Sequence, residues 1–334
     1  MKRIYQFFLI ISLSCFSKMY GQDMHFTQFY SSSLYLNPAF AGAEVCGRVS
    51  TTYRNQWPGV SKAYSSYLLS GDHYIPDYHI GFGLLFGTDA AGSGNLKTTT
   101  IAPLVAYEVK MTKTLIMRFG VQPGIGIHSI SFNQLLFGDQ IARGGGGIPT
   151  IEEQTKSKTY FDIGAGMLAY TKSFWLGSSL YHLNRPNESL IIGNESFLPV
   201  RYTAHGGYSY VINEDEKEEF KQKSIAAAFN YRGQSNFDQL DIGAYYMQYV
   251  FNLGIWYRGM PFLKSYQPGY SNNDALALIV GFKTERLNIG YSFDFTISKL
   301  VGQTAGAHEV TLSYQLCKLT KKKKKRIIVP CPKF

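Results

Sequence analysis

The sequence predicts an all-β fold: a transmembrane antiparallel β-barrel of about 14 strands, with an N-terminal signal peptide. Three observations point to this class: the composition, a period-two alternation of residue types, and alternating connection lengths. The 334 residues include 25 Tyr, 23 Phe and 33 Gly, and only 17% are charged. Such a chain is too aromatic and too glycine-rich for a helical bundle, and its charge is too sparse for a disordered protein.

Residues 1–22 have the pattern of a secretory signal peptide. Two cations, Lys2 and Arg3, precede an apolar stretch from Ile4 to Phe16, and small or polar residues follow around Gly21. The apolar stretch is too short for a permanent membrane anchor, so we expect cleavage near Gly21 or Gln22 and export of the mature chain.

Residues 23–43 form an arm ahead of the first expected strand, in the periplasm or in the barrel lumen. This segment contains five aromatic residues, which a free arm would hardly expose to water. One interpretation is a plug inside the lumen or a docking strand for a partner. The other is plain packing under the floor of the barrel, and we favour packing in the lumen or at the floor over docking.

Residues 44–317 carry the alternation that predicts the barrel. In residues 286–297, the apolar Leu287, Ile289 and Tyr291 alternate with small or polar residues, which places the two kinds on opposite faces of a strand. Asp162 and Asp294 fall on the polar face, where we expect them to point into the lumen. Fourteen such segments are expected, at 44–54, 63–74, 79–87, 97–110, 115–131, 160–170, 173–182, 200–212, 222–233, 239–248, 251–258, 275–284, 286–296 and 306–317.

The connections between these segments alternate in length. The gaps after odd-numbered segments hold roughly 5 to 28 residues, whereas most gaps after even-numbered segments hold about five or fewer. Bacterial outer-membrane barrels have an even number of strands, long outer loops and short periplasmic turns. With this parity, both the mature N-terminus and the C-terminal tail are expected in the periplasm. A soluble β-sandwich also alternates, but it needs no such separation of connection lengths.

A basic tail, residues 318–334, follows the last expected strand. The net charge is +10, but three cations of the leader and eight of the tail exceed this surplus, so the body is close to neutral. We therefore expect no basic face for nucleic acid. The tail's six consecutive cations would bind an acidic periplasmic partner, peptidoglycan or lipid headgroups, or would simply be solvated; they are Lys321, Lys322, Lys323, Lys324, Lys325 and Arg326.

Three cysteines remain in the mature chain: Cys46, Cys317 and Cys331. In an oxidising compartment an odd number allows at most one internal bridge. Cys317 and Cys331 are the nearest pair in sequence and are a candidate disulfide, although a buried thiol or a loosely tied tail is an equal alternative.

Trp57 and Pro58 lie in the first outer loop, where an aromatic residue next to a proline makes a stiff tip. We consider them a contact for a secreted partner or, equally, a membrane-interface tryptophan with its neighbour. No motif for a catalytic triad, a phosphate loop or a zinc site is evident, so the sequence predicts no catalytic, cofactor or metal residues and no enzyme activity.

Several stretches of the mature chain resemble the PorP/SprF family of outer-membrane proteins. The most distinctive are YRNQWPGV and YSFDFTISKL, and the others include HFTQFYSSSLYLNPAFAG, LLFGDQI, FDIGAGMLAY, SSLYHLNRPNESL and GAHEVTLSY. These stretches are spread along the whole mature chain.

The resemblance implies a bacterial outer-membrane barrel that works with the type IX secretion system and gliding motility machinery of Bacteroidetes. It also implies client proteins such as large adhesins, which the barrel helps to secrete or attach, and an OmpA-like peptidoglycan-associated partner in the periplasm. Two other functions stay open at this point: a channel or transporter for small solutes, and a passive tether between the outer membrane and peptidoglycan.

Overall fold

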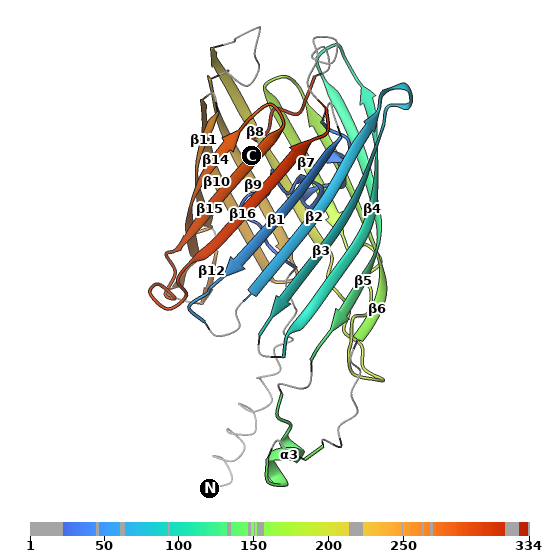
Figure 1. Cartoon of the computed structure of the whole chain (residues 1–334), viewed down its shortest axis with the longest axis vertical. Coiled ribbons are helices and arrows are strands. Elements are labelled where there is room, and N and C mark those ends of the chain that lie inside the picture. Colours follow the sequence, from blue (N-terminus) through green and yellow to red (C-terminus); the bar gives the residue numbers. More distant parts are fainter. Residues whose placement is uncertain are drawn as a thin grey trace.

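The computed structural model shows one closed antiparallel barrel of 14 strands, which confirms the predicted fold (Figure 1). The structure describes residues 23–44, 47–60, 64–92, 94–131, 135–145, 148–149, 151, 157–213, 223–248, 250–261, 264–267, 270–317 and 327–332. The predicted signal peptide, residues 1–22, lies outside them. Among the described residues, no helix is long and apolar enough to cross a membrane.

Each barrel strand pairs with its neighbours in the chain, and β1 closes the ring against β16. The strands are β1 (Arg48–Gln56), β2 (Tyr64–Ile75), β3 (Ile80–Ala91), β4 (Leu96–Lys110), β5 (Ile116–Ser129), β6 (Ser157–Tyr170), β7 (Phe174–Tyr181), β8 (Arg201–Asn213), β9 (Lys223–Gln234), β10 (Phe237–Gln248), β11 (Phe251–Gly259), β14 (Asn273–Lys283), β15 (Leu287–Thr296) and β16 (Ala307–Gln315).

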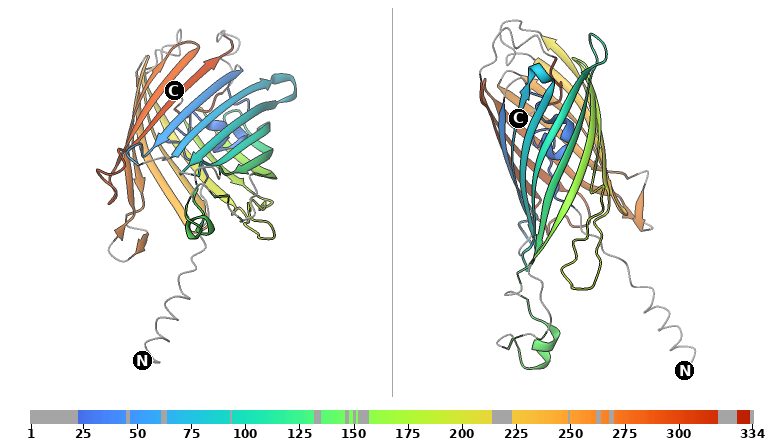
Figure 2. Two further views of the ribbon diagram at one scale, coloured as in Figure 1. Left: turned by 60° about the horizontal axis from the view of Figure 1, so that its bottom comes forward. Right: turned by 90° about the vertical axis from the view of Figure 1, so that its right-hand side faces the viewer.

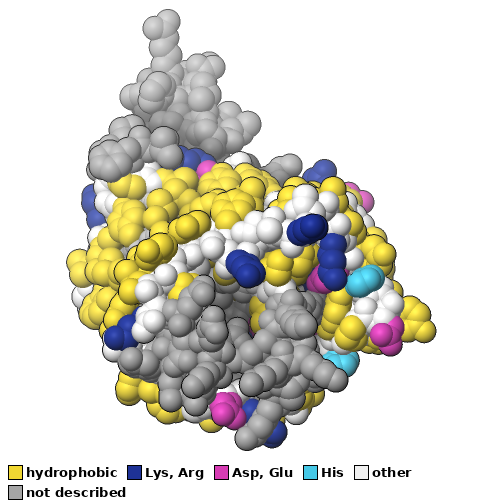
Figure 3. Space-filling view, turned by 90° about the horizontal axis from the view of Figure 1, so that it is seen from above, with side chains coloured by type: hydrophobic (Ala, Val, Ile, Leu, Met, Phe, Trp, Pro, Cys, Tyr) yellow, Lys and Arg dark blue, Asp and Glu magenta, His cyan; other side chains and the backbone are white. Residues whose placement is uncertain are grey.

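The period-two pattern produces the two faces of the wall. On β15, Ile289 and Tyr291 are exposed on the outside of the ring, whereas Asn288 and Ser292 are buried inside. Seen along the barrel axis, hydrophobic side chains lie around the outside of the ring and several Lys and Arg side chains lie at its rim (Figure 3). An apolar outer band and a polar interior are the faces that a barrel needs in lipid.

The two ends of the barrel differ as the connection lengths predict. One end carries short turns, such as η2 (Pro76–Tyr78) between β2 and β3. The other end carries the long connections, which include α3 (Gly138–Ala142) and the small hairpin of β12 (Ser265–Gln267) and β13 (Tyr270–Ser271) (Figures 1 and 2). Because long loops face the outside in bacterial barrels, we call these the inner (short-turn) and outer (long-connection) ends.

The N-terminal arm lies inside the barrel, where the short blue helices are visible through the wall (Figures 1 and 2). It contains α2 (Ser33–Leu36) and η1 (Pro38–Phe40), and most of its residues are buried. Asn37 separates the two helices and caps η1, because its side chain accepts a hydrogen bond from the backbone N–H of Ala39. The arm therefore fills the lumen that fourteen strands enclose.

The direction of the arm differs from our expectation. Asp23 contacts His182, which follows β7 at the outer end, whereas Gly42 contacts Asp72 near the inner end. The arm thus runs through the lumen from the outer to the inner end before β1 begins at Arg48. The expectation that the mature chain starts on the periplasmic side is wrong. The buried polar contacts of Asp23 hold the start of the arm at the outer end of the barrel.

The C-terminal tail also differs from the expectation that it lies wholly in the periplasm. The six-cation run of residues 321–326 lies outside the described residues. Beyond it, Val329 and Cys331 are buried in the same hydrophobic cluster as the arm residues Phe29 and Tyr30. Residues 327–332 therefore turn back into the barrel and share its interior with the arm.

Candidate functional site: the lumen and its N-terminal arm

The outermost contacts of the arm form a charged cluster around Asp23. Its carboxylate lies 2.7 Å from Nε2 of His182 and 2.9 Å from Nη1 of Arg201. His182 also faces Asp162, with 3.0 Å between Nδ1 and Oδ2, so one imidazole bridges two carboxylates. The carboxamide of Gln234 accepts a hydrogen bond from the backbone N–H of Asp23. These groups fix the start of the arm to β6, β8, β9 and the loop after β7.

The charges of this cluster shift the pKa values of its members. Burial alone would lower the pKa of His182, but the charge of Asp23 and hydrogen bonds to Asp162 and Asp23 raise it to about 9. Burial would likewise raise the pKa of Asp23, yet the charges of His182 and Arg201 hold it below its usual value. His182 is therefore a cation at neutral pH, paired with anionic Asp23.

Deeper in the lumen, Glu309 of β16 receives the arm backbone. Its two carboxylate oxygens accept hydrogen bonds from the N–H groups of Thr27, at 2.7 Å, and Gln28, at 2.8 Å. The guanidinium of Arg54 on β1 pairs with Glu309 at 3.2 Å and with Asp294 at 2.8 Å. Glu309 is fully buried, so each partner compensates a charge that would otherwise be costly in this interior.

Arg258 of β11 extends the same network around the wall. It pairs with Asp241 at 2.8 Å and with Asp294 at 3.0 Å. It also donates a hydrogen bond to the hydroxyl of Thr27 at 3.1 Å. The hydroxyl of Thr27 in turn donates to the carboxylate of Asp294. The arm thus completes a polar network that spans strands from both sides of the barrel seam.

The middle of the arm packs through aromatic side chains. Tyr30 and Trp175 meet edge to face, with 5.6 Å between ring centroids, and the indole N–H donates to the Tyr30 hydroxyl at 3.1 Å. Phe29 meets Trp256 in the same way, at 4.8 Å, and Trp256 packs against Tyr245. Buried aromatic rings of this kind supply a large share of apolar area, so they hold the arm in the lumen beyond its polar contacts.

Asn37 anchors the arm at its bend. Its amide group donates to the backbone carbonyls of Met167, at 2.9 Å, and Ser178, at 3.0 Å. The same nitrogen lies 3.2 Å from Nε2 of the fully buried His205. Both N–H donors of the Asn37 side chain are thus used on the wall, while its oxygen accepts from Ala39 of the arm.

Arg118 of β5 captures the arm near the inner end. Its guanidinium donates to the carbonyl of Ala39 at 2.9 Å and to that of Ala41, and it pairs with Glu108 at 2.6 Å. The last contact follows at Gly42, whose N–H donates to Asp72 at 2.9 Å. Because the fully buried Arg118 binds backbone carbonyls, it recognises the backbone conformation of the arm and not a particular side chain.

Glycines of the wall let the arm backbone approach closely. A Cβ at Gly120 would lie 2.3 Å from the backbone nitrogen of Ala39, and one at Gly81 would lie 1.9 Å from the carbonyl oxygen of Ala41. No side chain fits at these two positions unless the arm moves away.

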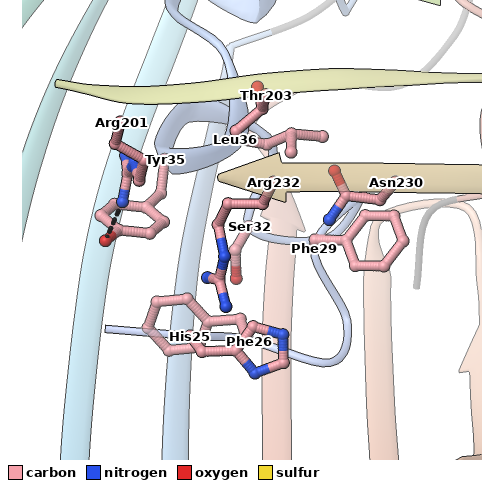
Figure 4. Close-up of a pocket in the computed structure, with 10 residues that line it drawn as sticks. All are labelled: His25, Phe26, Phe29, Ser32, Tyr35, Leu36, Arg201, Thr203, Asn230 and Arg232. Carbon is pink, nitrogen blue, oxygen red and sulfur yellow. Dashed lines mark hydrogen bonds between the residues drawn. The ribbon is translucent and has the colours of Figure 1, made fainter. Parts of the chain in front are cut away.

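A small cavity remains beside the arm, near its outer half (Figure 4). Its volume is about 20 Å³, enough for roughly one water-sized species. Wall and arm residues line it together: His25, Phe26, Phe29, Ser32, Tyr35, Leu36, Arg201, Thr203, Asn230 and Arg232. This space does not accommodate a typical organic substrate, which needs several hundred Å³.

The site can hold a peptide segment, and its ion pairs serve that purpose. The carboxylates described above bind arginines or backbone N–H groups of the arm, and no cluster of three metal-ligating side chains occurs among the described residues. The arrangement is that of a barrel whose interior is specific for its own N-terminal segment.

The residues singled out from sequence lie elsewhere. Trp57 lies at the outer end, where its backbone N–H donates to the carbonyl of Gly306 at 2.8 Å. Its ring packs edge to face against that of Tyr64, with 5.8 Å between the ring centroids. Trp57 is half-buried and Pro58 is exposed. Neither Trp57 nor Pro58 lies in the lumen, and the role of these two residues as a partner contact stays a prediction.

Of the two alternatives for Cys317 and Cys331, the disulfide between them is wrong, and Cys331 is the buried thiol. Cys317 is disulfide-bonded, whereas Cys331 is a buried thiol that packs among apolar side chains. Nearness in sequence is a poor guide here, because residues 327–332 return into the barrel and carry Cys331 into its interior.

Sequence reasoning missed the wall residues that receive the arm, above all Glu309 and Arg118. Charged residues on the inward face of a strand were a usable signal, and Asp162 and Asp294 were placed in the lumen on that ground. Their partners were not predictable, since the arm contacts join residues far apart in the chain.

Comparisons with known proteins place the chain in a family. The family model described as type IX secretion system membrane protein PorP/SprF matches residues 18–314. No curated protein matches the sequence.

Solved structures of similar fold are outer-membrane proteins of low sequence identity. The monoaromatic hydrocarbon channel CymD is 12% identical, with a TM-score of 0.48 over 85% of this chain and 91% of its own. The toluene transporter TodX of P. putida is 11% identical, with a TM-score of 0.46 over 86% and 95%. The outer membrane protein Omp33 of Acinetobacter baumannii is 8% identical, with a TM-score of 0.45 over 82% and 100%. From its sequence and its fold, the chain belongs to the PorP/SprF family of type IX secretion system membrane proteins and is a β-barrel of the bacterial outer membrane.

Proposed function

We propose that the protein is an accessory component of the type IX secretion and gliding machinery. It assists the secretion or surface attachment of large adhesin-like client proteins through protein–protein contacts, and it is not an enzyme. The single observation that carries this proposal beyond family membership is the occupied lumen: an arm of the chain's own residues fills the space through which a solute would pass.

The filled lumen favours this function over the alternative, a channel for small solutes. A conducting barrel needs a continuous polar path with weak, multiple sites. Here most of the inward charges are paired with one another or with the arm, and Tyr30, Trp175 and Trp256 pack across the middle. The surface of the lumen therefore binds the arm, and the outer loops and the periplasmic end are the surfaces that can bind partner proteins.

The partners that we propose follow from the two ends. Clients of the type IX system would meet the outer loops, including Trp57 and Pro58. An OmpA-like peptidoglycan-associated protein would meet the periplasmic end, where the cations of residues 321–326 would add attraction to an acidic surface. We propose no nucleic-acid partner.

Deletion of the gene tests the proposal. We expect surface adhesins to be retained in the cell or degraded, because their attachment depends on this barrel, while uptake of small nutrients stays normal. Restoration by the wild-type gene is the control. Normal adhesin display in the deletion strain would contradict the proposal, and a nutrient-uptake defect alone would favour the channel.

The periplasmic contact has its own test. Replacing all six cations from Lys321 to Arg326 by glutamine should reduce co-purification of a cell-wall-associated partner. Replacing six exposed residues of the outer loops should leave that co-purification unchanged. Equal recovery with the glutamine variant would mean that the basic run does not bind this partner.

A further inference from the structure

The cavity beside the arm has an unusual electrostatic lining. Among its ten lining residues are two arginines and a histidine, and there is no aspartate or glutamate (Figure 4). The arm contributes His25 and Ser32, and the wall contributes Arg201, Asn230 and Arg232. A cavity that is lined by two arginines and by aromatic rings lacks a counter-charge of its own.

Arg232 is the group most in need of that counter-charge. Within the described part of the chain it forms no ion pair, and its hydrogen bond goes to the neutral amide of Gln239 at 3.3 Å. The nearby carboxylates are engaged elsewhere: Asp241 pairs with Arg258, and Asp23 pairs with Arg201 and His182. Because Arg232 is half-buried, bulk water screens its charge less than it would at the surface.

Arg201 supplies a second, independent sign of a missing partner. This side chain is 97% buried, since only 3% of it is exposed. Its guanidinium is held between the rings of Tyr35 and Tyr181, at 4.6 and 4.2 Å from their centroids. Its Nη1 binds Asp23, yet its Nε has no hydrogen-bond partner among the described residues. A buried N–H donor without an acceptor is costly, so an acceptor in the adjoining cavity would relieve that cost.

His25 offers a further donor from the arm. The amide of Gln239 donates to Nε2 of His25 at 3.0 Å and also to the carboxylate of Asp241, which fixes the orientation of that amide. The proton of the neutral imidazole is then on Nδ1. Burial, followed by the positive charges of Arg258, Arg232 and Arg54, lowers the pKa of His25, so the ring is neutral in a positive field.

We infer that this cavity binds one small monovalent anion, chloride being the physiological species, between Arg232, Arg201 and His25. The volume of about 20 Å³ favours a single small ion over a larger organic anion. The bound anion contacts His25 of the arm and two arginines of the wall, and these contacts stabilise the outer half of the arm in the lumen. This role is separate from client or partner binding.

Halide binding by the purified full-length protein tests the inference. Thermal unfolding in detergent is measured in sodium chloride and in sodium gluconate at equal ionic strength, since gluconate is too large for the cavity. Chloride should raise Tm in a saturable way, by roughly 2 °C or more at saturation. Arg232→Gln should remove this dependence, whereas Arg286→Gln, which deletes the same charge near the inner end, should keep it.

Crystals of the wild-type protein in sodium bromide provide a readout that does not depend on a variant folding. A bromide anomalous peak between Arg232 and Nε of Arg201 is expected. If no peak occurs there and Tm is the same in both salts, the cavity holds water and the inference is overturned. A chloride effect that persists in Arg232→Gln, with bromide found elsewhere, would equally refute this site.

Discussion

The backbone N–H of Gln28 in the arm donates a 2.8 Å hydrogen bond to the carboxylate of Glu309 on the last barrel strand, 281 residues further along the chain. Through this contact the N-terminal arm and the strand that closes the barrel stabilise each other. The complete binding site of the arm exists only when β16 has joined β1, and the carboxylate of Glu309, which also pairs with Arg54, gains its two backbone N–H donors only when the arm is present.

Replacing Glu309 by alanine should strongly destabilise the protein. The change leaves the N–H groups of Thr27 and Gln28 without acceptors and removes one partner of Arg54. Breaking a buried ion pair of this kind costs about 3–5 kcal/mol in the free energy of unfolding. Denaturant unfolding in detergent measures the loss. Glu195→Ala in an exposed loop is the control and should cost less than about 0.5 kcal/mol.

Gly120→Ala should loosen the arm although it adds a single methyl group. The new Cβ would lie 2.3 Å from the backbone nitrogen of Ala39, so the arm must shift. Overpacking of this kind costs about 1–3 kcal/mol, and hydrogen exchange of the arm amides should become faster. Gly138→Ala in α3 is the matched control, because a Cβ there meets nothing within 4 Å. Equal exchange in both variants would mean that the arm does not press against β5.

Stability should fall at alkaline pH through His182. Its folded-state pKa of about 9 exceeds the unfolded value of 6.5, so its stabilising contribution is fully present below pH 6.5 and is lost as pH rises through 9. Thermal unfolding between pH 6 and pH 10 should show this loss, and His182→Gln should flatten the profile over that range. His308→Gln, on the other side of the wall, is the control and should leave the wild-type slope. An unchanged slope in His182→Gln would contradict the cluster with Asp23 and Asp162.

The thiol of Cys331 should resist modification in the folded protein. It is only 7% exposed and belongs to the hydrophobic cluster around the arm. A maleimide reagent should label it slowly in detergent and rapidly in denaturant, whereas a cysteine introduced at the exposed Gln303 should react at once in both. Rapid labelling of Cys331 under native conditions would show that residues 327–332 lie outside the barrel.

Local patterns predicted the wall well. The strict alternation on β15 predicts a strand with one apolar and one polar face. The short connections predict that consecutive strands pair as hairpins. The number and order of the strands could therefore be predicted from patterns that extend over only a few residues. The largest errors are four residues each, at the start of β1, expected at residue 44 and found at Arg48, and at the end of β3, expected at residue 87 and found at Ala91. The last long-range contact of the arm, from Gly42 to Asp72, lies just before the expected boundary.

The candidate site was much less predictable. The inward placement of Asp162 and Asp294 followed from strand period, but the identity of their partners depended on how a closed barrel brings distant strands around one segment. The direction of the arm and the return of residues 327–332 also depend on these long-range contacts. Aromatic content indicated that the arm would be protected, without indicating which end of the barrel it would enter.

Planar-bilayer recording of the full-length protein shows whether the arm closes the lumen to ions. Because the arm fills the lumen with ion pairs and packed aromatic rings, we expect no stable conductance steps at any salt concentration, under conditions in which an open porin conducts. A stable conductance that rises with salt would contradict a filled lumen and would favour a solute channel.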